Sequence, residues 1–113
     1  MAEKKILLEK LRNRIQLGEE FAVEQYVEEY NGRVCYCAVG HLLKDCGIDL
    51  TDLKEDYFIN SRRIDSNDLT QYAKPLLDVG FELDELRKIQ SLNDGAYTED
   101  LEQYIGSLLE PLV

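Results

Sequence analysis

The chain has 113 residues, of which 44% are hydrophobic, and a formal net charge of -10. This length predicts one compact domain, residues 1–113, with a single modest core. The charge argues against direct binding to nucleic acid or anionic lipid, because both need clustered lysine and arginine side chains. No apolar run approaches the ~20 residues that span a bilayer, so we expect a cytoplasmic protein without membrane contact.

Apolar residues near the N-terminus recur at helical spacing, and charged residues fill the other positions. Gly18 follows this stripe and is typical of a helix end. The first predicted element is therefore a helix that stops before Gly18. Its inward stripe consists of Ile6, Leu7, Leu8, Leu11 and Ile15.

The next segment has two possible interpretations. Residues from Phe21 to Tyr30 could form a helical stripe, but Asn31-Gly32 separates the β-prone runs 26–30 and 33–37. Asn-Gly between two such runs is a strong hairpin signal, since both turn residues adopt positive φ. We favour a short β-hairpin around Asn31-Gly32.

The part of the chain after the predicted hairpin is expected to be mostly helical. One begins near Cys37 and ends at Gly47, where glycine suits a left-handed cap, and the connector 48–68 holds a short helix. Ser66-Asn67-Asp68 caps a helix that Pro75 should kink or restart, and that ends at Gly80. Further helices open at Asp84 and Thr98. The predicted fold class is α+β and mainly α, with about four to six helices.

The cysteine block at 35–43 carries most of the reactive side chains. Cys37 lies at a predicted helix N-terminus, where the helix dipole favours a thiolate, and His41 follows one turn later. Asn93 or Asp94 could orient the imidazole, as in thiol hydrolases. Buried packing explains the same cysteine without any reactivity, so we predict no catalytic residue and keep the hydrolase as the alternative.

A zinc site is the third interpretation of this block. Cys35, Cys37, His41 and Cys46 lie within twelve positions, but one residue separates the first two cysteines where structural zinc sites have two to four. On a helix, His41 and Cys46 would point about 140° apart. Three cysteines cannot all pair in one chain, and free thiols are the default in the cytosol. We therefore predict no metal, no disulfide and no cofactor.

The Leu92-Asn93-Asp94-Gly95 block suits the end of one helix and the turn into the next. Side-chain oxygens would cap amide groups there, and Gly95 would adopt positive φ.

Several blocks of the chain resemble a family of small phage and prophage proteins. These blocks are Leu17 to Phe21, Gln25-Tyr26, Cys37 to Leu42, Leu92-Asn93-Asp94 and Thr98 to Ile105. The family typically has a Cys-Cys-Leu-Gly-Val-Leu block and a Leu-Asn-Asp block before a helix. This chain has Ala38 for the second cysteine, His41 for the usual valine and a shorter loop after Asp94. The resemblance implies a phage-related origin and no particular activity.

Charge and tyrosine content favour a role in protein binding. Acidic residues dominate after position 18, and seven tyrosines are present. Tyr26, Glu28, Glu29 and Tyr30 would place tyrosine among carboxylates on the predicted hairpin, which is typical of a protein-binding surface. The leading hypothesis is a non-catalytic interaction protein that binds a basic protein surface, as an inhibitor of a host nucleic-acid-handling protein.

Overall fold

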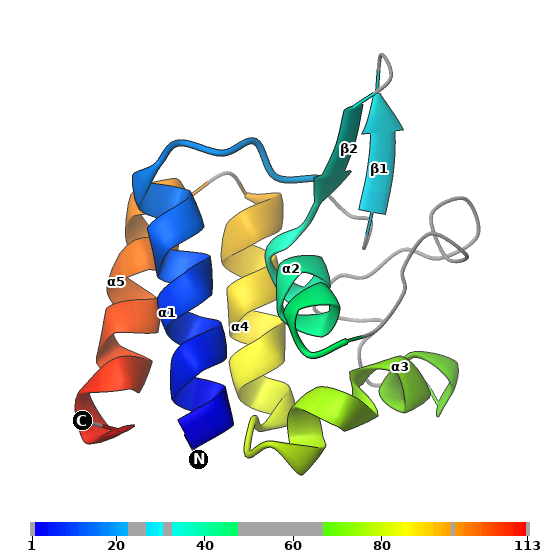
Figure 1. The fold of residues 1–113 in the computed structure, drawn as a ribbon, viewed down its shortest axis with the longest axis vertical. Coiled ribbons are helices and arrows are strands. Elements are labelled where there is room, and N and C mark those ends of the chain that lie inside the picture. Colours follow the sequence, from blue (N-terminus) through cyan, green and yellow to red (C-terminus); the bar gives the residue numbers. More distant parts are fainter. Residues whose placement is uncertain (1, 23–26, 31–32, 48–66, 96, 113) are drawn as a thin grey trace.

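The computed structural model describes residues 2–22, 27–30, 33–47, 67–95 and 97–112, with the backbone alone at 2, 27–30, 33–34 and 67–72. Most of this part is helical, which confirms the predicted mainly α class (Figure 1). No helix in the described ranges is both long and apolar enough to cross a membrane. The elements in chain order are α1 (Ala2–Gln16), β1 (Val27–Tyr30), β2 (Arg33–Tyr36), α2 (Ala38–Asp45), α3 (Asn67–Asp78), α4 (Leu83–Asp94), α5 (Thr98–Leu109) and a 3-10 turn (Glu110–Leu112).

Helices α1, α4 and α5 form a bundle (Figure 1). α1 and α4 run in the same direction and α5 runs in the opposite one, so the end of α1, the end of α4 and the start of α5 meet at one end of the bundle. α1 packs on α5 and α2, and α4 packs on the same two helices. The largest fully buried side chains join these helices and α3 in one core: Leu8, Leu11, Leu42, Leu43, Leu76, Leu86, Ile89, Leu101 and Ile105.

The apolar stripe predicted for α1 is the face that α1 buries. Leu8 and Leu11 are fully buried, and each such side chain stabilises the fold by about 1.5–3 kcal/mol. Ile6, which was assigned to the same stripe, is instead half exposed. The core therefore uses the Leu7, Leu8, Leu11 and Ile15 positions and leaves Ile6 on its edge.

The short strands lie beside α2. β1 and β2 pair antiparallel, with Val27 opposite Tyr36 and Tyr30 opposite Arg33. The predicted Asn31-Gly32 turn lies outside the described residues. The Ala22 amide donates to the Tyr36 carbonyl at 3.0 Å, which fixes the segment after α1 to the end of β2.

Helix ends agree with the sequence at three glycines and differ at two other positions. Gly18, Gly47 and Gly80 have φ of 77°, 102° and 109°, as their places after helices predict. α3 continues through Pro75 as one helix, without the predicted restart. The predicted positive φ at Gly95 is wrong: its φ is -83°, and a Cβ at this position would contact the exposed Tyr97 ring.

Candidate functional site

Cys37 is the N-cap of α2, as its place in the sequence predicts. Its Sγ accepts a hydrogen bond from the Gly40 amide at 3.1 Å, and its carbonyl accepts from the His41 amide at 2.8 Å. The side chain is fully buried. Burial raises the pKa of the Cys37 thiol to about 12, and the Asp94 carboxylate adds to the effect. The thiol is therefore neutral at pH 7 and lacks the thiolate that a nucleophile requires.

His41 is also held inside the fold, one turn after Cys37. Its ring lies between Phe21 and Tyr36, with ring centroids 5.1 Å and 5.2 Å away. Burial lowers the pKa of His41 to about 3, and the charges of Arg14 and Lys44 lower it further. The imidazole is neutral at pH 7, and its Nδ1 has no hydrogen-bond partner.

Asn93 joins three segments of the chain. Its Oδ1 accepts from the Ala38 amide at 3.0 Å, and its Nδ2 donates to the Ala22 carbonyl at 2.8 Å. Nδ2 also lies 3.2 Å from an Asp94 carboxylate oxygen, which accepts from Gln90 as well. The predicted capping role of Asn93 is real, but the capped helix is α2 and not the next helix in sequence.

The four candidate residues Cys37, His41, Asn93 and Asp94 lie close together but do not form a catalytic arrangement. The amide of Asn93 is used by two backbone groups and does not bond to His41, and the Cys37 thiol bonds to its own helix. Cys37 therefore caps its own helix, and Asn93 holds α2 against α4 and the segment after α1. A general base, an oriented imidazole and an ionised thiol are all lacking at this position.

The candidate metal ligands Cys35, Cys37, His41 and Cys46 are not arranged in a way that favours a metal site. Cys35 and Cys46 are half-buried and Cys37 is buried, and all three are free thiols. Cys46 Sγ donates to the Leu43 carbonyl at 3.2 Å. Within the described residues, no group of three or more cysteine, histidine or acidic side chains could hold a metal ion.

The predicted binding residues cannot be placed as a surface. Tyr26 lies outside the described residues. Glu28, Glu29 and Tyr30 belong to β1, where the structure describes the backbone alone.

A different acidic surface lies at the bundle end where α1 ends and α5 begins (Figure 1). Leu17 is 73% exposed and Tyr97 59%, and they are the two most exposed large apolar side chains of the described residues. The Gln16 amide donates to Glu102 at 3.0 Å, which holds this end of α1 against the start of α5. The surface, here called the acidic end, consists of Leu17, Glu19, Glu20, Tyr97, Glu99 and Asp100, all exposed.

Two hollows lie beside the segment that leaves α1. One, of about 330 Å³, separates this segment from the start of α5 and is lined by Phe21, Leu92 and Thr98 among others. The other, of about 590 Å³, lies toward β2 and α2. Gly18, Glu19 and Glu20 line both, and Leu17, Cys35, Tyr36 and His41 complete the second.

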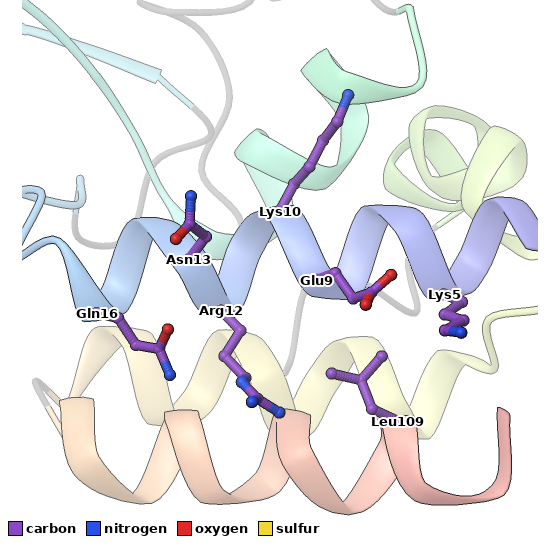
Figure 2. Close-up of a pocket in the computed structure, with 7 residues that line it drawn as sticks. All are labelled: Lys5, Glu9, Lys10, Arg12, Asn13, Gln16 and Leu109. Atoms are coloured by element: carbon purple, nitrogen blue, oxygen red, sulfur yellow. The ribbon is translucent and has the colours of Figure 1, made fainter. Parts of the chain in front are cut away.

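A groove of about 570 Å³ on the outer face of α1 has the opposite charge (Figure 2). Lys5, Lys10 and Arg12 line it with Glu9 and Leu109, and these three cations have no ion-pair partner among the described residues. Their side chains diverge in Figure 2, because Lys10 extends toward α2 and Arg12 toward α5. They do not converge on a single anion, so the groove is best described as a solvated face.

The acidic end was missed in the sequence although one signal was available. Leu17 follows the inward residue Ile15 by two positions, which is about 200° around a helix and therefore on the outer side. Tyr97 stands directly before the acidic first turn of α5.

The chain was compared with protein-family models, curated proteins and solved structures, and none matches it.

Proposed function

We propose that this chain is a non-catalytic protein-interaction module that binds a basic protein surface through its acidic end. The observation that carries the proposal is that two exposed apolar side chains, Leu17 and Tyr97, and four exposed carboxylates lie at the same end of the bundle. Apolar anchors surrounded by charge are typical of protein interfaces. Tyrosine is well suited to this role, because its ring is large and has few rotatable bonds.

Electrostatics define the partner that this surface fits. The four carboxylates attract lysine and arginine and repel acidic surfaces, and the net charge of -10 strengthens both effects. Nucleic-acid-handling proteins expose such basic surfaces. Together with the resemblance to phage and prophage proteins, this supports a host protein of that class as the partner and inhibition by occupation of its basic surface as the role.

The use of Cys37, His41 and Asn93 in internal contacts supports a binding function over the thiol hydrolase. The described part of the chain likewise offers no third ligand that would favour the zinc alternative. We therefore propose no catalytic residue.

A pair of matched variants tests the proposal. The first replaces Glu19, Glu20, Glu99 and Asp100 by the corresponding amides, and the control does the same at Glu3, Glu9, Asp78 and Glu110, which are exposed elsewhere. Both remove four negative charges, so general electrostatics change equally. Each tagged protein is used to capture partners from host lysate at two salt concentrations, after circular dichroism has verified folding.

A basic protein that is lost from the first variant but kept by the control would support the proposal. Leu17→Ser with Tyr97→Ser should lose the same protein without any change in charge. Equal capture by all variants, or no specific capture by the parent chain, would contradict it.

A further inference from the structure

The hollow between the segment after α1 and the start of α5 has an apolar wall that is open to solvent. Ile15 and Leu101 form the buried part of this wall, and Phe21 and Leu92 are half-buried. Each of these side chains comes from a different segment: α1, α5, the segment after α1, and α4. Apolar side chains that meet around a surface hollow are typical of a binding pocket for an apolar group.

Polar groups of the same wall are already used inside the fold. The side-chain amide of Asn93, which lines the hollow, bonds to the Ala38 amide and the Ala22 carbonyl. The backbone amides of Gly18 and Glu19 donate to carbonyl groups of the last turn of α1, at 3.0 Å and 3.2 Å. A polar occupant would exchange its hydrogen bonds to water for few partners here, which costs free energy. The wall therefore favours an apolar occupant.

The hollow is large enough for one bulky side chain. An apolar cavity of ~150 Å³ accepts benzene, and the volume of this hollow is about 330 Å³. Leu17 and Tyr97, both exposed, precede Gly18 and Thr98, which line the hollow from its two sides. The two exposed apolar residues of the acidic end therefore adjoin opposite walls of the hollow.

Charge at the acidic end defines what flanks the apolar group. The described residues that line the hollow include no lysine, arginine or histidine. Glu19 pairs with Arg14 at 3.5 Å, so the attraction for a partner comes from Glu99 and Asp100. These two are exposed and have no ion-pair partner among the described residues. They attract a segment that contains lysine or arginine and repel an acidic one.

The helical period places these carboxylates beside the hollow and not inside it. Thr98 and Leu101 line the hollow, three positions apart on one side of α5. Glu99 and Asp100 lie between them in sequence, at about 100° and 200° from Thr98 around the helix axis. Basic residues that meet these carboxylates must therefore flank the apolar residue and do not enter the hollow with it.

We propose that this hollow binds one large apolar side chain of the protein partner, in a segment where lysine or arginine flanks it. The apolar side chain packs against Phe21, Leu92 and Leu101, and the flanking cations meet Glu99 and Asp100. The inference rests on the proposed function and names the partner segment that the acidic end recognises.

Two peptides that differ in one residue test the proposal. The first is a short capped peptide with leucine at its centre and two basic residues on each side, and the control has serine in place of leucine. Each is titrated into the ¹⁵N-labelled protein, and the amide signals of Gly18, Thr98 and Leu101 are followed by nuclear magnetic resonance. The leucine peptide should shift them saturably with a dissociation constant of about 1 mM, and the serine peptide should bind about tenfold more weakly.

Three results would overturn the inference. The first is equal affinity of the two peptides, because charge alone would then account for binding. The second is no shift with the leucine peptide at tenfold higher concentration. The third is a shift of the same amide signals when the protein alone is concentrated, because a second copy of the chain would then fill the hollow.

Variants separate the apolar contribution from the charge. Thr98 is exposed and lines the hollow, so Thr98→Phe places a ring in it and should abolish the preference for leucine. Gln103→Phe, at an exposed position of α5 outside the hollow, is the matched control and should keep that preference. Glu99→Gln with Asp100→Asn should weaken both peptides about two- to fivefold per charge and leave their ratio unchanged. A preference that survives in Thr98→Phe, with folding verified by circular dichroism, would contradict the inference.

The two proposals fail in different ways. If Thr98→Phe captured the basic partner as the parent chain does, while the amide variant of the acidic end did not, the inference about the hollow would fall and the proposed function would stand. Loss of capture by both, with capture retained in Gln103→Phe, would support both proposals. If the parent chain captured no basic protein, the proposed function would fall, and the peptide titration would still decide whether the hollow accepts an apolar side chain.

Discussion

The side chain of Asn93 on α4 caps α2, with its Oδ1 3.0 Å from the backbone nitrogen of Ala38, 55 residues earlier in the chain. The same amide donates to the Ala22 carbonyl. One buried side chain therefore satisfies two backbone groups that come from different segments, and it couples the position of α2 to that of the segment after α1.

Replacement of Asn93 by alanine should lower the free energy of unfolding by about 2–4 kcal/mol, because the Ala38 amide and the Ala22 carbonyl both lose a partner in a buried site. Urea denaturation followed by circular dichroism measures this loss. Asn13→Ala, at an exposed position of α1, serves as the control and should change stability by less than about 0.5 kcal/mol. A loss below 1 kcal/mol for Asn93→Ala would mean that water replaces the side chain.

Cys37 should resist alkylation in the folded protein. Iodoacetamide reacts with thiolates, and burial raises the pKa of this thiol to about 12, so at pH 7.5 both ionisation and access are suppressed. Mass spectrometry of proteolytic peptides should find Cys35 and Cys46 modified before Cys37, and equal modification of all three only in urea. His41→Phe should not alter the Cys37 rate. Rapid labelling of Cys37 that depends on His41 would instead support the thiol hydrolase.

Local patterns predicted the helices well because their signals are contained within each segment. The stripe that includes Leu8 and Leu11, the cap at Cys37 and the glycine after each of three helices all act over a few residues. Contacts between segments that are distant in sequence were harder to predict. Nothing near Asn93 in sequence indicates that it caps α2, since that contact depends on how α4 packs.

The candidate site was harder to predict for the same reason. Cys37 and His41 form a reactive-looking pair in sequence, and only their burial and partners remove the reactivity. Leu17 and Tyr97 come from distant positions, and the bundle brings their neighbouring segments together. A surface formed by the ends of two helices has no continuous sequence motif that would predict it.

His41 should make the protein less stable as the pH falls. Its pKa is about 3 in the folded chain against an ordinary value of 6.5, so below pH 6.5 the unfolded chain binds a proton that the folded chain excludes. The stability that neutral His41 contributes is complete above pH 6.5 and is lost toward pH 3. The loss is at most about 1.4 kcal/mol per pH unit.

Comparison with His41→Phe isolates this effect from the titration of the carboxylates, which both proteins share. The difference in unfolding free energy should move in favour of the variant by about 1–2.5 kcal/mol between pH 7 and pH 4.5. Parallel pH profiles from urea denaturation would show that the folded chain accepts the proton at His41.

The ion pair of Lys4 and Glu85 should behave as a buried pair, unlike the exposed pair of Arg87 and Asp84. Lys4 is 9% exposed, and its Nζ donates to Glu85 at 2.9 Å and to the Gly80 carbonyl at 3.2 Å. Glu85→Met leaves the ammonium group without its counter-charge and should cost about 2–4 kcal/mol.

Lys4→Met should cost less, because Glu85 keeps the Glu82 amide as a donor at 2.9 Å and is less deeply buried. The double replacement should then be more stable than the sum of the single losses predicts, since it removes both charges and leaves two apolar side chains beside Phe81. Asp84→Asn is the matched surface control and should change stability by less than about 1 kcal/mol. Additive losses in this double-mutant cycle would mean that the two charges are solvated independently and that the pair does not hold α1 against the start of α4.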